Sequence, residues 1–390
     1  MLQRHRKKIG VLITLMVLVC LIPLSSIADP IETTYKKLRI FAQVLSFVQN
    51  NYVDNVSEEE LMHDAIRGLL KSLDPHSVFM TASEYQKTQE DTSGAYGGLG
   101  IVISKIKNKS FIIKSVAADS PAAHAGLRPG DQLIAVDGLP VKKMSLRKLS
   151  IKIRGLPDTS LKLRIMRSGW SKHRDILLVR KRVQMVSVNH ERIDKHYGYI
   201  AIRSFQEKTA LEVKTSLKAL QKPNQNPIKG LILDLRDNPG GLFDQGVAVA
   251  DLFLHQGLIV STESRHERHR EVQRAHPEDT NQKLPLVVLV NRNTASSSEI
   301  LAGALKAHKR AHIMGENTYG KGSVQTLIGL EDGSGLKITV ARYKTPEGET
   351  IPATGIPPNE ILSYANDEPG TKSQGLKADP WIRAALKYLQ

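Results

Sequence analysis

The first clear pattern along the chain is a stripe of apolar residues at helical spacing between residues 38 and 48. The stripe consists of Leu38, Phe41, Val44, Leu45 and Val48, with polar residues on the other faces. A second helical pattern begins after Ser57, which forms an S-x-x-E capping box with Glu60, and it ends at Asp74-Pro75. The sequence therefore predicts two amphipathic helices near the N-terminus.

From residue 196 onward, short β-branched runs alternate with segments of helical spacing. The predicted strands cover 196–202, 231–235 and 284–290, and the predicted helices cover 211–220, 242–253 and the residues from Glu299. This alternation predicts an α/β core with right-handed crossovers. After residue 355 the pattern indicates a closing strand, a polar linker and a short amphipathic helix.

Three serines mark the change from the predicted strand at 284–290 to the helix that follows. The strand breaks at Asn291-Arg-Asn293, and Ser296-Ser-Ser298 precede the first helical positions. Ser296 and Glu299 fit the S-x-x-E box that caps a helix. A helix N-terminus also presents N–H groups and a positive dipole end, which suit a nucleophile whose attack creates an oxyanion. Capping and catalysis are compatible roles, so both interpretations stay open.

A candidate base for such a nucleophile is Lys321, twenty-five residues after Ser296. Gly320 and Gly322 flank the lysine and let the backbone pass close to the serine. A lysine side chain has a pKa of about 10.4 in water, but burial away from other charges lowers that pKa by several units. The neutral amine then accepts a proton from a hydroxyl, and Gln325 is placed to orient it by hydrogen bonding.

Two segments around these residues resemble the carboxyl-terminal processing proteases, or tail-specific proteases. The segments are Thr294-Ala-Ser-Ser-Ser-Glu-Ile-Leu-Ala-Gly-Ala-Leu305 and Tyr319-Gly-Lys-Gly-Ser-Val-Gln325. Proteins of this family are Ser/Lys endopeptidases with an embedded PDZ domain and an α/β core of the ClpP/crotonase type. The resemblance implies that Ser296 is the nucleophile, Lys321 the base and Gln325 the residue that positions the lysine. Ser297 stands where the family usually has alanine, so a second hydroxyl adjoins the nucleophile.

The segment from Tyr96 to about Val183 resembles a PDZ domain. The match rests on the glycine-rich stretch from Tyr96 and on Ser120-Pro-Ala-Ala-His-Ala-Gly-Leu-Arg-Pro-Gly-Asp-Gln-Leu-Ile-Ala-Val-Asp-Gly138. In such a domain an extended peptide adds to a sheet edge, and N–H groups of a glycine-bearing loop hold its terminal carboxylate. The resemblance assigns this loop to Gly98, Leu99, Gly100 and Ile101. A dinucleotide site is excluded, because the glycine spacing differs and β-type residues follow.

The turn Asn238-Pro-Gly-Gly241 follows the predicted strand at 231–235. From the residues alone, a simple tight turn accounts for it. The resemblance implies a further role, in which Gly240, Gly241 and the N–H of Ser297 form an oxyanion hole. Glycine suits this role because it lets bare N–H groups approach a substrate carbonyl closely.

Arg154, in Ile151-Lys-Ile-Arg-Gly155, resembles a position where an arginine of the PDZ domain helps to hold related proteases in their active form. The resemblance therefore implies a regulatory role for Arg154. The alternative is an exposed arginine that closes a helix and interacts favourably with the helix dipole.

Residues 1–28 have the features of a secretory signal peptide. A basic start precedes an apolar stretch from Ile9 to Leu24, and Ser26-Ile-Ala28 forms a cleavage site. Sixteen mostly apolar positions are short for a membrane-spanning helix, which needs about 20. Cleavage near Ala28 is therefore favoured over the alternative of an uncleaved membrane anchor. The only cysteine, Cys20, lies in this leader, so the mature chain needs no disulfide.

The chain is basic, but its charge pattern does not predict nucleic-acid binding. Removing the leader takes away four of the 55 lysines and arginines and none of the 39 acidic residues, which leaves a formal net charge of +12. The basic residues are spread along the chain without aromatic interleaving, and an exported protein meets little nucleic acid. A solvated basic surface is the favoured interpretation.

Other chemistries fit the sequence less well. His266 and His269 lie among basic residues and outside any H-E-x-x-H arrangement, which disfavours a metal site. The stretch Gly315–Lys321 resembles a P-loop, but Gly322 supplies no hydroxyl for Mg²⁺ and a strand pattern follows. No G-x-S-x-G elbow surrounds Ser296, which disfavours a Ser-His-Asp hydrolase. The sequence therefore predicts no metal, nucleotide or other cofactor.

Taken together, the patterns and the resemblance predict an exported, periplasmic serine endopeptidase that recognises and cleaves substrates with accessible C-termini. The expected segments are a signal peptide at 1–28, a helical segment at 29–92, a PDZ domain at 93–183, the protease core at 184–365, and a linker with a helix at 366–390. The resemblance implies self-association into a homo-oligomer through the N-terminal helices, and it leaves the need for an adaptor protein open. The alternative function is a non-catalytic PDZ scaffold that binds protein C-termini.

Overall fold

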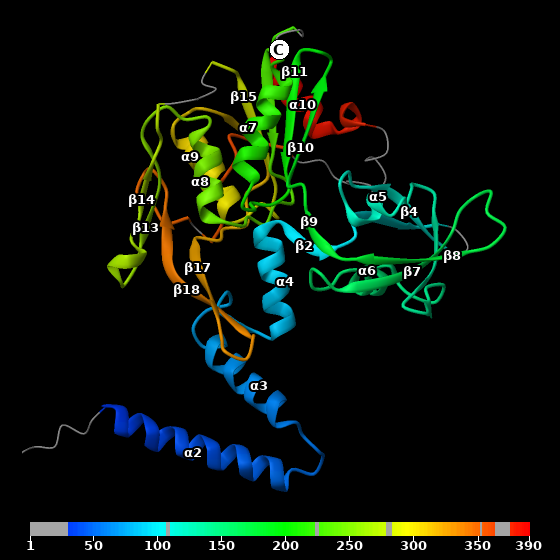
Figure 1. Cartoon of the computed structure of the whole chain (residues 1–390). Helices are drawn as coiled ribbons and strands as arrows, with labels where there is room; N and C mark the ends of the chain where they lie inside the picture. The colour runs from blue at the N-terminus through cyan, green and yellow to red at the C-terminus, as the bar shows by residue number, and fades with distance from the viewer. Residues whose placement is uncertain (1–29, 107–109, 223–225, 278–282, 352, 363–374) are drawn as a thin grey trace, which may run out of the picture. The chain divides into compact units, whose positions relative to one another are not determined.

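The computed structural model describes residues 30–106, 110–222, 226–277, 283–351, 353–362 and 375–390 (Figure 1). The predicted signal peptide and residues 366–374 of the predicted linker lie outside the described residues. The chain divides into two compact units, Met1–Leu73 and Asp74–Gln390. No helix in the described ranges combines the length and the apolar character that a membrane crossing requires.

The first unit contains two helices where the apolar stripes predict them, α2 (Pro30–Asn51) and α3 (Glu58–Lys71). Ser57 caps α3, because its hydroxyl oxygen accepts a hydrogen bond from the N–H of Glu60 at 3.4 Å. Much of the apolar stripe of α2 is exposed in the single chain. Leu38, Phe41 and Val44 of the stripe, and Phe47 on the same helix, are between 40% and 69% exposed.

In the second unit, a six-stranded antiparallel sheet follows the glycine-rich segment near residue 98. Its strands are β3 (Ile101–Lys105), β4 (Phe111–Val116), β5 (Gln132–Val136), β6 (Leu139–Pro140), β7 (Ser160–Met166) and β8 (Arg174–Val179). The short helices α5 (Pro121–His124) and α6 (Leu146–Ile153) complete a core around Phe111 and Leu163. A two-stranded ribbon of β2 (Ala95–Gly98) and β9 (Lys181–Gln184) lies where the chain enters and leaves this domain.

The largest part of the unit is built on a second six-stranded sheet. Its order is β10 (Val188–Ile193), β11 (Tyr197–Ile202), β12 (Gly230–Asp234), β15 (Leu286–Val290), β16 (His312–Gly315) and β19 (Glu360–Ile361). All neighbours pair in parallel except β10 and β11, which are antiparallel. The predicted alternation of strands and helices is therefore present in this sheet and its helices.

Helices cover both faces of this sheet, which explains why its strands are almost continuously apolar (Figure 1). On β12, Leu231 and Leu233 pack in the cluster formed with α7 (Thr209–Leu220), α8 (Phe243–Asp251) and α9 (Ser297–Ala307). Ile232 points the other way and packs with α10 (Pro380–Leu389). The C-terminal helix thus closes the face opposite α9.

A third sheet carries the segment that follows Lys321. Its order is β1 (Val78–Met80), β18 (Gly335–Lys344), β13 (Leu258–Glu263) and β14 (Val272–Arg274), and β17 (Ser323–Gly329) also pairs with β18. The alternation after Lys321 predicts β17 correctly. His266 and His269 lie in the connection between β13 and β14, where the short helix η1 (Glu267–His269) forms. Helix α4 (Ala82–Ser93) leads from β1 toward β2.

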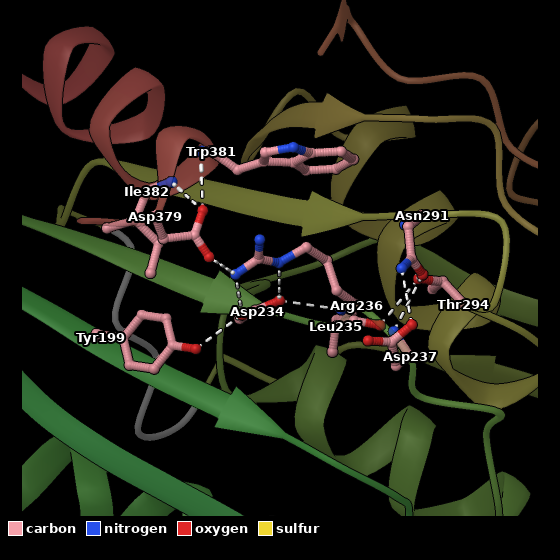
Figure 2. Close-up of polar contacts among 10 residues, drawn as sticks. All are labelled: Tyr199, Asp234, Leu235, Arg236, Asp237, Asn291, Thr294, Asp379, Trp381 and Ile382. Carbon is pink, nitrogen blue, oxygen red and sulfur yellow. Dashed lines mark hydrogen bonds and ion pairs between the residues drawn. The ribbon is translucent and has the colours of Figure 1, made fainter. Parts of the chain in front are cut away.

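A buried ionic cluster joins the end of β12 to the start of α10, as Figure 2 shows. The guanidinium of Arg236 contacts Asp234 at 2.8 Å and Asp379 at 2.9 Å, and it lies 5.5 Å from the ring centre of Trp381. The Tyr199 hydroxyl donates to Asp234 at 2.7 Å. The two carboxylates raise the pKa of Arg236 strongly against the effect of burial. Arg236 is therefore always positively charged, and through Asp379 it holds the start of the C-terminal helix beside the turn at 238–241.

We expect Arg236→Leu to lower the free energy of unfolding by about 3 to 5 kcal/mol, because it leaves Asp234 and Asp379 together in a buried place without their cation. Urea denaturation followed by far-UV circular dichroism measures this. Arg164→Leu is the matched control, since it breaks a two-bond pair with Asp175 on the surface and should change stability far less. Equal losses in the two variants would contradict a special role for the buried cluster.

Candidate active site

Ser296 is held in an unusual backbone conformation directly before α9. Its φ is 57° and its ψ is −118°, a combination that a residue other than glycine rarely adopts. Hydrogen bonds fix both sides of the preceding loop: the Thr294 hydroxyl donates to the Leu235 carbonyl at 2.8 Å, and the Ala295 N–H donates to the Asn238 carbonyl at 3.0 Å. Strain that neighbouring contacts maintain is a feature of functional positions.

The three serines of the junction have different surroundings, which bears on the choice of nucleophile. Ser297 and Ser298 are completely buried, and their hydroxyls donate to the carbonyls of Gly241 at 3.0 Å and Asn238 at 3.2 Å. Ser296 is 6% exposed, and its hydroxyl has a hydrogen bond with the Tyr343 hydroxyl. Burial raises the pKa of Tyr343 to about 12, so this phenol is neutral. The structure therefore gives Ser297 and Ser298 a structural task that Ser296 does not have.

The turn Asn238–Gly241 lies against Ser296. A methyl group placed on Gly240 would meet the Ala295 carbonyl oxygen and the Ser296 Cβ at 2.7 Å, so only glycine fits there. The Gly240 N–H donates to the Asn238 side chain at 2.9 Å, and is therefore engaged within the turn. In the described part of the chain, the N–H groups of Gly241 and Ser297 have no hydrogen-bond acceptor. The structure thus brings the predicted oxyanion residues together, with Gly240 shaping the turn.

Lys321 lies between β16 and β17 in a mostly buried position. Burial lowers the pKa of its amine to about 8, and the charge of Lys337 acts in the same direction. The carboxylates of Glu299 and Asp74 oppose this change. A substantial fraction of the amine is therefore neutral near physiological pH, as a general base requires.

A single carboxylate, that of Glu299, connects the backbones of Ser296 and Lys321. Its Oε2 accepts hydrogen bonds from the Ser296 N–H at 2.8 Å and the Lys321 N–H at 2.9 Å. Its Oε1 accepts from the Gly320 N–H at 2.7 Å and the Thr318 hydroxyl at 2.6 Å. Glu299 is completely buried, and these four donors offset the cost of removing a carboxylate from water.

The sequence identifies Glu299 only as the third residue of a capping box. The link from Glu299 to Ser296 is that capping contact, but the contacts to Gly320 and Lys321 join segments about 20 residues apart and depend on the fold. The sequence signal for such a role is a glutamate directly before a mainly apolar helical run, here Ile300 to Leu305, because a charged residue beside a buried run needs partners.

Gln325, on β17, is near the lysine in sequence but is not bonded to it. Its amide nitrogen donates to the Ser323 hydroxyl at 2.8 Å and to the Thr339 hydroxyl at 3.3 Å. Among the described residues, no hydrogen bond joins Gln325 to Lys321. The positioning role that the resemblance implies for Gln325 stays a prediction.

The predicted carboxylate-binding loop, Gly98–Ile101, leads into β3, which is an edge strand of its sheet with α6 packed beside it. The loop is anchored on α5, because the Ala122 N–H donates to the Leu99 carbonyl at 3.0 Å. Gly100 has a φ of 74°, and a methyl group there would lie 2.3 Å from the Ser120 Cβ. An edge strand beside a helix is the arrangement that β-augmentation by a peptide needs.

Arg154 is the residue that ends α6, beside this loop. Its guanidinium lies 4.3 Å from the ring centre of Tyr96, in the geometry of a cation–π contact. The next residue, Gly155, donates its N–H to the Gly97 carbonyl at 3.0 Å. Arg154 is therefore attached to the strand that leads into the predicted carboxylate-binding loop.

Comparison with known proteins gives consistent matches along the chain. The profile of peptidase family S41 matches residues 196–362, that of the PDZ domain matches 88–166, and that of the N-terminal domain of the activating protease CtpB matches 23–84. The chain is 39% identical over 334 residues to the carboxy-terminal-processing protease of Bartonella bacilliformis, covering 85% of this chain and 76% of the relative. It is 36% identical over 322 residues to the carboxy-terminal processing protease CtpA of Bacillus subtilis, covering 82% and 68%.

A solved structure supports the fold. It comes from Bacteroides fragilis NCTC 9343, is assigned to the S41 proteases, and aligns with a TM-score of 0.50 at 16% identity over 83% of this chain and 89% of that chain. The two profile matches in the second unit cover residues 88–166 and 196–362. The chain therefore belongs to peptidase family S41, and it is a serine protease of the carboxy-terminal processing type that carries a PDZ domain.

Proposed function

We propose that this protease cleaves peptide bonds with a dyad of Ser296 as nucleophile and Lys321 as general base. The observation that carries the proposal is the shared contact to Glu299, whose Oε2 accepts the backbone N–H groups of both residues. The lowered pKa of Lys321, about 8, supports its role as a base. The commitment of the Ser297 and Ser298 hydroxyls to backbone carbonyls supports Ser296 over its two neighbours.

In the proposed mechanism, the neutral amine of Lys321 takes the hydroxyl proton of Ser296 while Oγ attacks the scissile carbonyl carbon. The N–H groups of Gly241 and Ser297 donate to the oxyanion, and Gly240 keeps the turn close to the serine. The Lys321 ammonium then gives its proton to the leaving amine, which departs as the acyl–enzyme forms. Water releases the second product by the same steps, with Lys321 again as base.

We propose that the PDZ domain selects substrates by their free C-terminus. The edge strand β3 and the loop Gly98–Ile101 support this proposal, because they provide a strand to extend and N–H groups for a carboxylate. The contact of Arg154 with Tyr96 supports a regulatory role for the arginine, since it joins α6 to the strand before that loop. Binding of a C-terminus would then favour the active form of the dyad.

The remaining parts of the proposal concern assembly and location. The exposed apolar residues of α2 can pack against the same residues of a second copy, so we propose a homo-oligomer formed through this helix. Sedimentation velocity of Phe47→Glu, compared with the parent chain, would test this.

We further propose that the segment at 1–28 directs export to the periplasm and that the protease core at 184–365 is of the ClpP/crotonase type. Substrates would reach the core either directly or through an adaptor protein.

The dyad predicts a specific set of inactive variants and a pH profile. Ser296→Ala and Lys321→Ala should abolish cleavage of fluorescently labelled casein, whereas Ser297→Ala should retain most of it. Lys321→Arg should also be inactive, because the pKa of arginine stays above about 12. Because the pKa of Lys321 is lowered from 10.5 to about 8, kcat/KM should rise as the pH passes through about 8. Full turnover by Ser296→Ala, or a flat profile, would exclude this dyad.

The Glu299 contacts predict that Glu299→Gln impairs catalysis strongly. An amide has one acceptor oxygen and one donor nitrogen, so two of the four donors around it lose their acceptor. We expect kcat to fall by about tenfold or more, and stability to fall by about 1 to 3 kcal/mol. Glu331→Gln, in the exposed β17–β18 turn, is the matched control. Wild-type kcat in Glu299→Gln would show that the carboxylate is not needed to align the dyad.

The PDZ proposal predicts activation by a free C-terminus. Addition of a short apolar peptide with a free carboxylate should increase the rate of casein cleavage, and its C-terminal amide should not. Arg154→Ala should reduce this increase while the dyad is untouched, and Lys152→Ala, which removes a neighbouring charge, should preserve it. Identical rates with saturating acid and amide peptides would leave the PDZ domain as a passive anchor.

A further inference from the structure

Asp74 forms a dense set of hydrogen bonds at the start of the second unit. Its Oδ1 accepts from the N–H groups of His76 at 2.8 Å and Ser77 at 2.9 Å, and its Oδ2 accepts from the Ser77 hydroxyl at 2.7 Å. The sequence predicts only that Asp74-Pro75 ends a helix. The structure adds a longer contact: the Thr339 hydroxyl, 265 residues away, donates to Oδ1 of Asp74 at 3.2 Å.

Strand pairing places this segment beside the active site. β1 pairs with β18 through Val78 and Lys337, and the Thr339 N–H donates to the Ser77 hydroxyl at 3.1 Å. β18 in turn pairs with β17, where Gln325 is the partner of Thr339. The Asp74 segment is therefore attached to the hairpin that follows Lys321.

The chemistry of the donors and acceptors orients the Gln325 amide. An ionised carboxylate only accepts hydrogen bonds, so the single hydroxyl proton of Thr339 is directed to Asp74. The Thr339 oxygen then accepts, and it faces the NH₂ group of Gln325 at 3.3 Å; the Ser323 hydroxyl takes the other N–H at 2.8 Å. With both protons engaged, the carbonyl oxygen of Gln325 is the group that remains for another partner.

The charges around Lys321 agree with this arrangement. Asp74 and Glu299 raise the pKa of the amine, and Lys337 lowers it. Burial, together with the charge of Lys321, lowers the pKa of the His76 imidazole. Asp74 is the negative charge that this segment contributes to the surroundings of the amine.

We propose that Asp74 is a positioning residue for the catalytic lysine: through Thr339 it orients the Gln325 amide so that the carbonyl oxygen, not the NH₂ group, is the atom available to the Lys321 amine during catalysis. This inference rests on the proposed Ser296/Lys321 dyad. It explains how Gln325 performs the role that the resemblance implies, although its NH₂ group is bonded elsewhere. It also makes the segment before β1 a part of the active site.

The test uses Thr339→Val in the full-length protein, with labelled casein as substrate. Valine keeps the β-branched shape but replaces the hydroxyl, which is hydrogen-bonded to both Asp74 and Gln325, with a methyl group. We expect kcat to fall by about tenfold with KM unchanged, the effect of one lost hydrogen bond in the transition state. Thr339→Ser should restore turnover. Thr326→Val, on the opposite face of β17 from Gln325, is the matched control.

A pH profile and a double-mutant cycle separate positioning from a merely structural role. Asp74→Asn removes a negative charge near the amine, so the rise of kcat/KM should move to lower pH, whereas Thr339→Val should leave its midpoint in place. In a Gln325→Ala background, Thr339→Val should cost nothing further, because the two residues act in series. Thermal denaturation identifies any variant that has lost its fold, and Thr339→Val remains decisive if Asp74→Asn does not fold.

The outcomes distinguish this inference from the proposed dyad. Activity in Ser296→Ala or Lys321→Ala would remove the dyad and this inference together. Inactive dyad variants with wild-type kcat in Thr339→Val, or with additive losses in the Gln325→Ala background, would overturn only the role of Asp74.

Discussion

The hydrogen bonds of the buried Glu299 carboxylate are the interactions on which the geometry of the proposed active site depends. The carboxylate accepts the N–H groups of Ser296, Gly320 and Lys321, so it joins the start of α9 to the loop before β17 at two points. Loop segments that carry catalytic groups are mobile unless something ties them down. A side chain on the rigid helix α9 provides that tie, because its backbone position is set by the apolar core around Leu301 and Leu305. The relative placement of Ser296 and Lys321, the proposed nucleophile and base, therefore follows from packing of the helix.

A second set of contacts connects the serine loop to the end of β12. Ser297, Ser298 and Thr294 donate to carbonyls of the segment 235–241, while Ala295 donates to Asn238. Figure 2 shows the same segment held on its other side by Arg236, which bridges Asp234 and Asp379. The turn at 238–241, the proposed oxyanion turn, is thus fixed between the Ser296 loop and the start of α10. Such preorganisation matters because donors aimed at a developing charge stabilise it most when they need not move.

The pKa of Lys321 results from opposing effects that no single residue controls. Burial and Lys337 favour the neutral amine, and Glu299 and Asp74 favour the ammonium. If the pKa of the amine is too low, the amine accepts a proton weakly. If the pKa is too high, the amine is already protonated, so a pKa near the working pH serves catalysis best. In the proposed mechanism, the carboxylates that align the dyad also keep the amine basic enough to take the serine proton. Alignment and proton affinity are therefore linked through the same side chains.

The sequence by itself determines the local elements and the identity of the family. Apolar spacing predicts α2 and the alternating strands and helices of the core, and the S-x-x-E pattern predicts the Ser57 cap of α3. These predictions succeed because each pattern involves residues within a few positions of one another. The resemblance names Ser296 and Lys321 and the loop Gly98–Ile101 from short motifs. Only the tertiary structure distinguishes the hydroxyl of Ser296 from those of Ser297 and Ser298, since the latter two donate to backbone carbonyls of a turn 56 and 60 residues away. Only the tertiary structure also shows the contacts of Glu299 with Gly320 and Lys321 and the contact between Asp74 and Thr339. A hydrogen bond between residues 265 positions apart leaves no periodic pattern in the sequence.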